Sequence, residues 1–368
     1  MGQKYSLKDN GSFVIKDYNQ ARPFSNFLPG ISGKWGIPLW VFYVNRGQGI
    51  ISFGLKDKNS AIAEFFPANK AYSFVSSLGF RTFIKIDKKE YFEPFKTFSH
   101  YKKKEQMQIK SASFEIKESN LRDRIDTKVK YFTLPNTPIA GLVRAVTIKN
   151  TSNKNINLEV LDGLPRIIPF GAANPFLKDM SRTLEAWMHS FIYDNLAIFR
   201  LIVDPRDTSQ TKYIEGANFN YTFLEANGKR LSSPMIVDPN AIFGQDTSYS
   251  VAAEFLNKNF KVPLNQMTVG KTPCSFSYFK LSLKKDEEKT FYSVFGAAFK
   301  TERIKKFTKS MDADFLKNKE CENKKIIEEI KNNALCISNS GSLNHYIKNT
   351  YLDNVLRGGY PWSVKNKE

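Results

Sequence analysis

The feature that most constrains this chain is a long succession of short strand-like segments without an intervening helical pattern. Between residues 13 and 299, segments rich in aromatic and β-branched residues alternate with clusters of turn formers. Residues 111–117 alternate small or apolar with polar positions, which is typical of a strand with one buried face. Residues 39–44 are apolar at both parities, which favours a strand buried on both faces. Since parallel strands need long crossover helices, this pattern predicts antiparallel sheets.

So many antiparallel strands require two large sheets packed face to face, so the predicted fold class is mainly β, an antiparallel sandwich. The composition agrees, because 14% of the residues are aromatic, most of them among 31 Phe, and aromatic residues favour strands. Further strands are expected at 80–87, 128–134, 142–149, 156–161, 196–203, 219–224, 249–255, 276–283 and 290–295.

Two local patterns give sharper predictions within this β region. Residues 144–149 and 156–161 read as strands, and the six residues between them are mostly turn formers, which predicts a β-hairpin. Residues 181–193 carry Leu184, Trp187, Met188 and Phe191 at spacings that fit one face of a helix. His189 lies in that segment, and we interpret it as structural.

The pattern changes to helical near Lys309. Residues 312–334 are polar and rich in helix formers, and Asp312 is placed to cap the first turn. A second helix fits residues 342–356, before the glycines at 358 and 359. The expected buried positions are Ile326, Ile327, Ile330 and Ala334 in the first helix and Leu343, Tyr346, Ile347 and Leu356 in the second.

This change divides the chain into a β domain at 1–309, a linker helix region at 310–341 and a further helical part at 342–368. Two helices cannot bury both of their faces alone. Either they pack against the sandwich, or they begin a helical domain of which the chain holds only the start. The second alternative predicts exposed apolar helix surface and poor solubility of the chain on its own.

Charge, cysteine content and hydropathy exclude several classes of function. The formal charge is +19, but the one tight basic run is Lys102-Lys103-Lys104, so nucleic acid is not an expected partner. Three cysteines without CxxC spacing argue against a disulfide framework and against zinc, and no metal site is expected. No apolar stretch is long enough for a membrane span, and no leader pattern precedes residue 16. We therefore expect a cytoplasmic protein that does not bind membranes.

The search for chemistry finds no phosphate-binding glycine loop, HExxH or GxSxG motif, and no catalytic residue is assigned. Trp35, Trp40 and Arg46 lie close together in sequence and are candidate substrate-binding residues, because sugar rings stack on aromatic faces and polar neighbours bind hydroxyls. The simpler interpretation, that these aromatic residues belong to the core of a strand pair, fits the pattern better.

The densest motif is DNVLRGGYP at 353–361. Asp353 and Arg357, on the last turns of a helix before paired glycines, could place a carboxylate and a guanidinium beside a cavity, so both are candidate substrate-binding residues. The same residues could equally form an ordinary helix end with a favourably placed arginine. The residues alone favour neither interpretation.

Three segments resemble the inverting glycoside phosphorylases of the cellobiose phosphorylase type, especially those acting on β-1,3-glucans. They are DYNQARPFSNFLPG at 17–30, continuing through Gly36 and Trp40 to Arg46 and Gly47; LEVLDGLPRIIPFG at 158–171; and YLDNVLRGGYP at 351–361. The resemblance covers residues 13–361. It implies a galactose-mutarotase-like β-supersandwich, then linker helices, then an (α/α)6 barrel, of which this chain would contain only the first helix.

The resemblance also implies an activity for the full-length family, which is of the glycosyltransferase class. One carboxylic acid protonates the leaving oxygen of a β-glucoside while inorganic phosphate, a co-substrate and not a cofactor, attacks the anomeric carbon. The catalytic acid and phosphate site belong to the barrel, so we expect this chain to be inactive alone. Its expected partners are a β-glucan oligosaccharide, a barrel-containing partner chain or a second copy. The alternative is a free-standing carbohydrate-binding sandwich or one half of a split enzyme.

Overall fold

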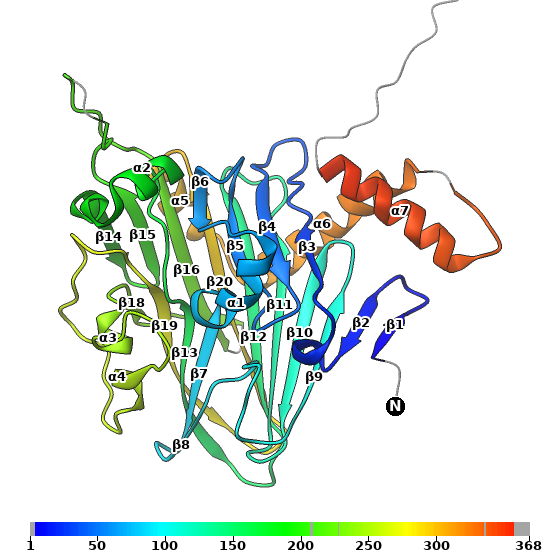
Figure 1. The fold of residues 1–368 in the computed structure, drawn as a ribbon. Helices are drawn as coiled ribbons and strands as arrows, with labels where there is room; N and C mark the ends of the chain where they lie inside the picture. The colour runs from blue at the N-terminus through cyan, green and yellow to red at the C-terminus, as the bar shows by residue number, and fades with distance from the viewer. Residues whose placement is uncertain (1–3, 207–208, 227, 335, 357–368) are drawn as a thin grey trace, which may run out of the picture.

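The computed structural model describes residues 4–206, 209–226, 228–334 and 336–356. Its largest element is an 11-stranded antiparallel sheet with the order β1-β2-β9-β10-β11-β12-β20-β16-β15-β14, to which β17 adds beside β16 (Figure 1). The strands are β1 (Tyr5–Leu7), β2 (Phe13–Lys16), β9 (Lys103–Ile109), β10 (Ser113–Asn120), β11 (Ile125–Thr133), β12 (Ala140–Asn150), β14 (Met188–Tyr193), β15 (Leu196–Leu201), β16 (Ala217–Ala226), β17 (Lys229–Leu231) and β20 (Glu288–Ala298).

Two smaller sheets pack on one face of the large sheet. One has the order β3-β4-β5-β6 and the other β18-β19-β13-β7-β8. Their strands are β3 (Ser25–Leu28), β4 (Leu39–Val44), β5 (Ile50–Leu55), β6 (Ser60–Ala63), β7 (Arg81–Ile86), β8 (Glu90–Phe92), β13 (Ile156–Leu164), β18 (Met235–Ile236) and β19 (Ser275–Leu283).

One hydrophobic core joins the three sheets. Tyr43 of β4 stacks on Phe114 of β10 with ring centroids 4.6 Å apart, and Phe279 of β19 stacks on Phe291 of β20 at 4.2 Å. Aromatic pairs of this kind add to the free energy of burying their apolar surface. The expected mainly β, antiparallel sandwich is confirmed, and every pairing between the strands of the described residues is antiparallel.

The predicted hairpin at 144–161 is wrong. β12 pairs with β11 and β20 in the large sheet, whereas β13 pairs with β7 and β19 in a small one. The turn formers at 151–155 therefore carry the chain across the sandwich from one sheet to the other. The amide of Asn150 holds this crossing, because its Nδ2 donates to the carbonyl oxygens of Lys154, Leu283 and Lys284. Turn chemistry predicts a reversal, but it does not specify which sheet the chain then joins.

The predicted helix at 181–193 is wrong for its second half. After α2 (Asn174–Asp179), residues Ser181–Trp187 form a 3-10 helix, η2, and residues 188–193 form strand β14. Pairing with β15 satisfies the backbone of 188–193, which overrides the local helical spacing. His189 lies there half-buried, with its ring 4.0 Å from that of Phe191, and burial followed by the charge of Arg200 lowers its pKa.

Short helices cover the outer faces of the small sheets. α1 (Ala68–Leu78) packs on β4 and β5 through Ala71 and Val75, and is seen in front of them in Figure 1. α3 (Asn240–Phe243) and α4 (Ala253–Leu256) belong to an excursion between β18 and β19 that covers the five-stranded sheet. η1 (Tyr18–Gln20) links β2 to β3.

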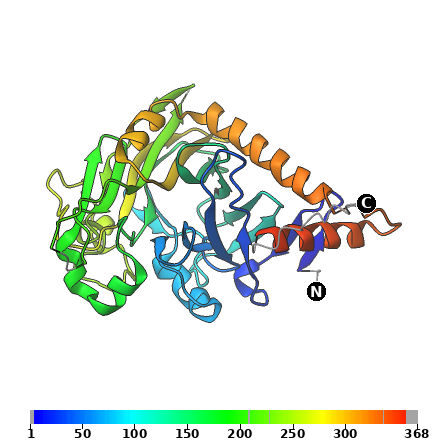
Figure 2. The ribbon, with the colours of Figure 1, turned by 90° about the horizontal axis from the view of Figure 1, so that it is seen from above.

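Three helices follow the last strand: α5 (Thr301–Thr308), α6 (Ala313–Asn332) and α7 (Gly341–Leu356). The predicted cap is confirmed, because the side chain of Asp312 accepts a 2.8 Å hydrogen bond from the amide of Phe315. Ile304 of α5 and Leu316 of α6 are buried against the outer face of the large sheet. Figure 2 shows α6 running along that face toward α7.

Polar contacts fix α6 on the sandwich along its length. Glu320 pairs with Lys130 of β11 at 2.5 Å, and Glu322 accepts a 2.7 Å hydrogen bond from Asn136. In the last turn of the helix, Lys331 donates to Ser111 at 2.8 Å. Of the two alternatives that the sequence left open for the first helix, the structure therefore has it packed against the sandwich.

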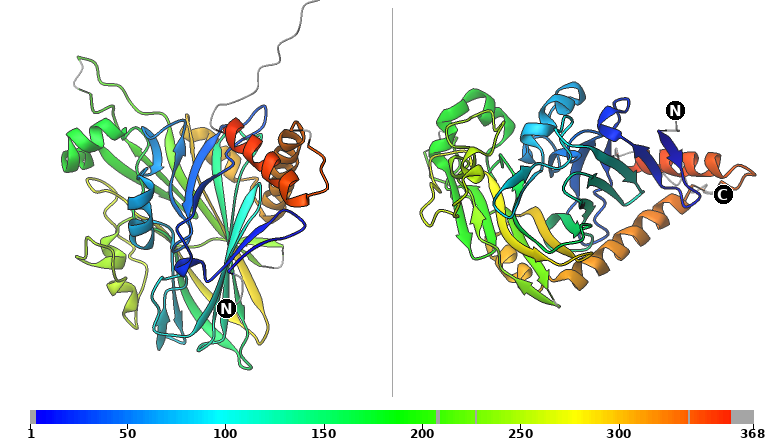
Figure 3. Two further views of the ribbon diagram at one scale, coloured as in Figure 1. Left: turned by 45° about the vertical axis from the view of Figure 1, so that its right-hand side comes forward. Right: turned by 90° about the horizontal axis from the view of Figure 1, so that it is seen from below.

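The second helix buries a different side from the one expected. Leu343 is 47% exposed and Tyr346 67% exposed, Ile347 is half-buried, and Leu352 is buried against Ile327 of α6. The same side of α7 reaches the turn of the β1–β2 hairpin (Figure 3), where a Cβ at Gly11 would lie 2.8 Å from the His345 ring. The side chain of Leu356 and the predicted glycine stop at 358–359 lie outside the described residues. No helix in the described ranges has the length and apolarity to cross a bilayer.

Candidate functional site

A cavity of about 270 Å³ lies where α7 and α6 meet the four-stranded sheet. The sandwich contributes the ends of β3 and β4 with the loop between them, and the helices contribute three side chains. The lining residues are Phe27, Leu28, Gly30, Ile31, Pro38, Leu39, Trp40, Ile330, Asp353 and Val355. A second hollow of about 520 Å³ adjoins it between α7 and the β1–β2 hairpin and shares Phe27, Leu28 and Asp353 with it. We call the first of these the Trp40 cavity.

The cavity combines an aromatic wall with a carboxylate. Trp40 is 37% exposed and its ring packs edge-on against Phe27, with centroids 5.4 Å apart. Asp353 extends from α7 to line both hollows. An apolar wall with a small number of polar groups is the usual composition of small-molecule sites. The structure thus brings together two predicted residues that are remote in sequence.

The shape of the cavity depends on one glycine and its electrostatics on Asp353. A Cβ on Gly30 would lie 1.6 Å from the carbonyl oxygen of Leu39, so only glycine permits the close approach of the chain after β3 to the start of β4. Tyr43 lines the neighbouring hollow. Burial, and then the negative charge of Asp353, raise the pKa of Tyr43 well above its ordinary value, so this phenol stays protonated and able to donate.

Arg46 is not part of this cavity. Its guanidinium donates to the carbonyl oxygens of Tyr18, Ala21 and Asn45 at 3.1, 2.8 and 2.7 Å, and lies 5.9 Å from the ring centroid of Tyr72. These contacts tie the β4–β5 turn to the η1 segment, which is a structural role.

Of the remaining predicted site residues, one lies apart from the cavity and one lies outside the residues that the structure describes. Trp35 is 74% exposed, its backbone amide donates to Asn136, and Lys34 lies 4.9 Å from its ring centroid. It does not line the Trp40 cavity. Arg357 falls outside the described residues.

Sequence reasoning missed a buried polar cluster at the centre of the sandwich. Arg144 of β12 and Asp162 of β13 form a two-point ion pair, at 3.0 Å from Nε and 2.6 Å from Nη2, with both side chains fully buried. Thr82 of β7 and Gln48 of the β4–β5 turn join them, and so does the hydroxyl of Tyr131. The cluster links all three sheets and has no opening, so it is structural. Asp162 lies within the 158–171 segment, which was the only sequence signal for it.

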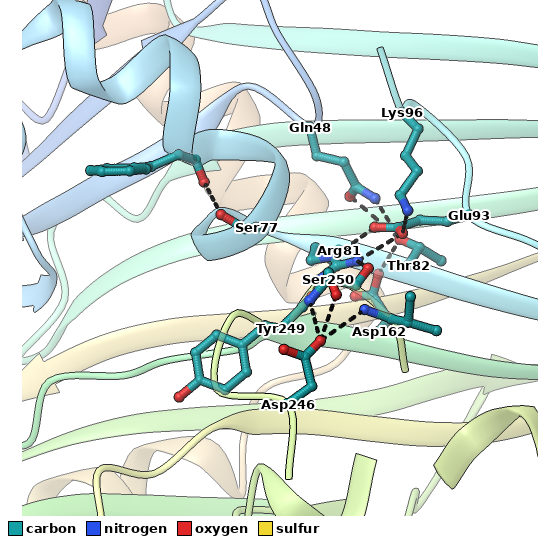
Figure 4. A network of polar contacts seen from close by, with 12 residues as sticks. Gln48, Ser77, Arg81, Thr82, Glu93, Lys96, Asp162, Asp246, Tyr249 and Ser250 are labelled. Carbon is teal, nitrogen blue, oxygen red and sulfur yellow. Dashed lines mark hydrogen bonds and ion pairs between the residues drawn. The ribbon is translucent and has the colours of Figure 1, made fainter. Parts of the chain in front are cut away.

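A second polar cluster fixes the excursion between β18 and β19. Arg81 of β7 pairs with Glu93 at 2.6 Å and also donates to the carbonyl oxygens of Tyr249 and Ser250 (Figure 4). Lys96 approaches the other oxygen of Glu93 at 3.0 Å. Within the described part of the chain, no group of three or more His, Cys, Asp or Glu residues is arranged to hold a metal ion.

Comparison with known proteins gives similarity of fold alone. No family model matches the chain, and no curated protein matches it in sequence. Among solved structures, a protein described as a kojibiose phosphorylase from the human microbiome aligns over 95% of this chain and 39% of its own, at 11% identity and a TM-score of 0.43. A bacterial glucoamylase complexed with acarbose aligns over 93% and 43%, at 11% identity and 0.46.

A galactose mutarotase-like protein from Clostridium acetobutylicum aligns over 80% of this chain and 97% of its own length, at 11% identity and a TM-score of 0.36. The chain thus spans about two fifths of the phosphorylase and of the glucoamylase that it matches. A shared fold does not specify a shared site, so no residue role is taken from these proteins.

Proposed function

We propose that this chain is the sandwich portion of an inverting glycoside phosphorylase and that its Trp40 cavity binds a β-glucan oligosaccharide. The observation that carries the proposal is the meeting of Trp40 and Asp353, one from each of two segments that resemble this family, in a single cavity. In this proposal α7 is the first helix of the catalytic barrel.

The chemistry of the cavity suits a sugar ring. The CH groups of a pyranose pack on an indole face, and Trp40 with Phe27 supplies an aromatic wall at the cavity. Hydroxyl groups of the sugar need hydrogen-bond acceptors, and the Asp353 carboxylate provides one at the cavity wall.

The proposed reaction assigns the remaining chemistry to a barrel. Phosphorolysis with inversion needs one general acid to protonate the leaving oxygen, and cationic or amide donors to hold phosphate. We propose that a barrel-containing partner chain supplies both, and that this chain positions part of the glucan. A carbohydrate-binding sandwich that acts alone is the second candidate. It is favoured by the docking of α6 on the sandwich, which buries one side of this helix without a barrel.

Calorimetric titration with β-1,3- and β-1,4-linked gluco-oligosaccharides tests the binding step. We expect heat of binding for the unmodified chain and a loss of at least about ten-fold in affinity for Trp40→Ala, because removing the aromatic wall removes the stacking contact. Trp35→Ala is the matched control, since Trp35 is an exposed tryptophan outside the cavity, and it should bind as the parent does. Absence of heat with every β-glucan would refute the proposed site.

Release of sugar 1-phosphate from the same oligosaccharides tests the reaction. We expect none from the purified chain and release on addition of the barrel-containing chain with inorganic phosphate. Binding without release under any such pairing would favour the sandwich that acts alone.

A further inference from the structure

A separate polar pocket lies on the other side of the molecule, between η2 and the excursion that contains α3. Its volume is about 180 Å³, below the roughly 300–1,000 Å³ usual for drug-sized ligands, so it has room for one small ring. It is lined by Arg182, Glu185, Pro239, Asn240, Phe243, Gly244, Gln245, Asp246, Thr247, Tyr249, Lys271 and Thr272. None of these residues lines the Trp40 cavity. We call it the Tyr249 pocket.

Both cations of the Tyr249 pocket are paired with carboxylates. Among its lining residues are two cations, Arg182 and Lys271, and two carboxylates, Glu185 and Asp246. Arg182 pairs with Glu185 at 2.9 Å, and Lys271 pairs with Asp238 at 2.9 Å. A free anion would therefore find no unpaired cation, and the Asp246 carboxylate is occupied by hydrogen bonds within its own loop. The composition favours a neutral ligand that can both donate and accept hydrogen bonds.

The backbone of the pocket is held in an uncommon conformation. Tyr249 has φ +56°, a left-handed value that is rare for an aromatic residue and that costs free energy. Asp246 accepts hydrogen bonds from the amides of Ser248 and Ser250, each at 2.9 Å, and from both of their hydroxyls, which winds the loop tightly. Hydrogen bonds from these two serines hold the pKa of Asp246 well below its ordinary value, so it remains ionised.

Arg81 holds this loop by hydrogen bonds to its backbone. Figure 4 shows its guanidinium between Glu93 and the carbonyl oxygens of Tyr249 and Ser250, while Asp246 lies on the far side of the loop. The Tyr249 ring packs against Phe243, with centroids 5.1 Å apart, and lines the pocket. Strained residues persist where the surrounding structure fixes them, and they concentrate at ligand sites.

We propose that the Tyr249 pocket is a second carbohydrate site that binds one neutral sugar ring. The Tyr249 ring provides the apolar surface for the ring CH groups, and the hydroxyl groups are met by Thr272, Glu185, Lys271 and the amide of Asn240 or Gln245. Thr272 donates to Glu185 at 2.7 Å, which orients the carboxylate at the pocket wall. This inference does not rest on the proposed function, because the two sites share no lining residue.

Saturation-transfer NMR with methyl β-D-glucopyranoside tests the second site, and it is carried out in the Trp40→Ala background so that the first cavity does not contribute. We expect saturation transfer in that background. Tyr249→Asn should weaken binding roughly ten-fold, because asparagine tolerates the left-handed backbone but lacks the aromatic ring. Thr272→Val should weaken binding roughly two- to ten-fold, because valine has the shape of threonine but lacks its hydroxyl.

Tyr213→Ala is the matched control, because Tyr213 is an exposed tyrosine that does not line the pocket. This variant should leave the saturation transfer to methyl β-D-glucopyranoside unchanged. Circular dichroism checks that each variant is folded. No saturation transfer in the Trp40→Ala background, or transfer that Tyr249→Asn and Thr272→Val leave unaltered, would overturn the second site. Competition by inorganic phosphate would also overturn it, since the pocket would then be an anion site. Loss of binding confined to Trp40→Ala would leave only the first site standing.

Discussion

Removal of Asp162 should destabilise the sandwich more than the loss of any surface charge. Asp162 and Arg144 are both 0% exposed, so solvent does not screen their interaction. Asp162→Ala leaves the Arg144 guanidinium buried without its carboxylate. Breaking a buried pair in this way costs about 3–5 kcal/mol of unfolding free energy.

The double variant Arg144→Met with Asp162→Leu should cost less than Asp162→Ala alone. It removes both charges, and Gln48 still has Thr82 as a hydrogen-bond partner at 3.0 Å. The hydroxyl of Tyr131 loses the guanidinium, and one buried unsatisfied polar group costs about 1–3 kcal/mol. The double variant is therefore expected to lose about that amount.

Guanidinium unfolding followed by far-ultraviolet circular dichroism measures these differences, once refolding has been shown to be reversible. The control is Arg122→Met, which breaks a partly exposed pair with Asp123 and should cost about 1 kcal/mol or less. The reasoning is refuted if Asp162→Ala costs no more than Arg122→Met. It is equally refuted if the double variant costs the sum of Arg144→Met and Asp162→Leu measured singly, because the pair would then not act as a unit.

Two further predictions concern single contacts. Asp312→Ala should lower the unfolding free energy by about 0.5–2 kcal/mol through loss of the α6 cap. Asp314→Ala, in the same helical turn, should lower it clearly less. Equal effects of the two variants in denaturant titrations would exclude a capping role. Burial raises the pKa of Glu118 above 4.5, although Lys103 and Tyr101 counteract it. The folded chain then binds more protons than the unfolded chain, so stability falls as the pH rises from 4.5 through the folded-state pKa. Glu118→Gln should flatten that decline in a series of melting temperatures against pH, and an unchanged slope would contradict the assignment.

Most of the strands, and the change to helices near Lys309, are predictable from the sequence alone. Alternation at 111–117 and the apolar run at 39–44 predict strands because the pleat places neighbouring side chains on opposite faces, and both segments contain strands. The cap at Asp312 was equally readable, since a cap acts within one turn of its own helix. These properties depend on residues only a few positions apart.

Tertiary structure decided everything that depends on distant partners. The turn at 151–155 can connect the strands of a hairpin or carry the chain between two sheets, and the pairing of β12 with β11 and β20 and of β13 with β7 and β19 distinguishes the two. The apolar spacing at 184–191 fits a helix until the free edge of β15 offers backbone partners.

Dependence on distant partners also explains why only some of the predicted site residues line the cavity. Trp35, Trp40 and Arg46 are neighbours in sequence, but the structure leaves the first in solvent and binds the third to backbone carbonyls. Trp40 instead meets Asp353, because α6 docks on the large sheet and so brings α7 over the end of β4. The free energy of that docking comes from contacts between residues remote in sequence, and local patterns contain no information about them.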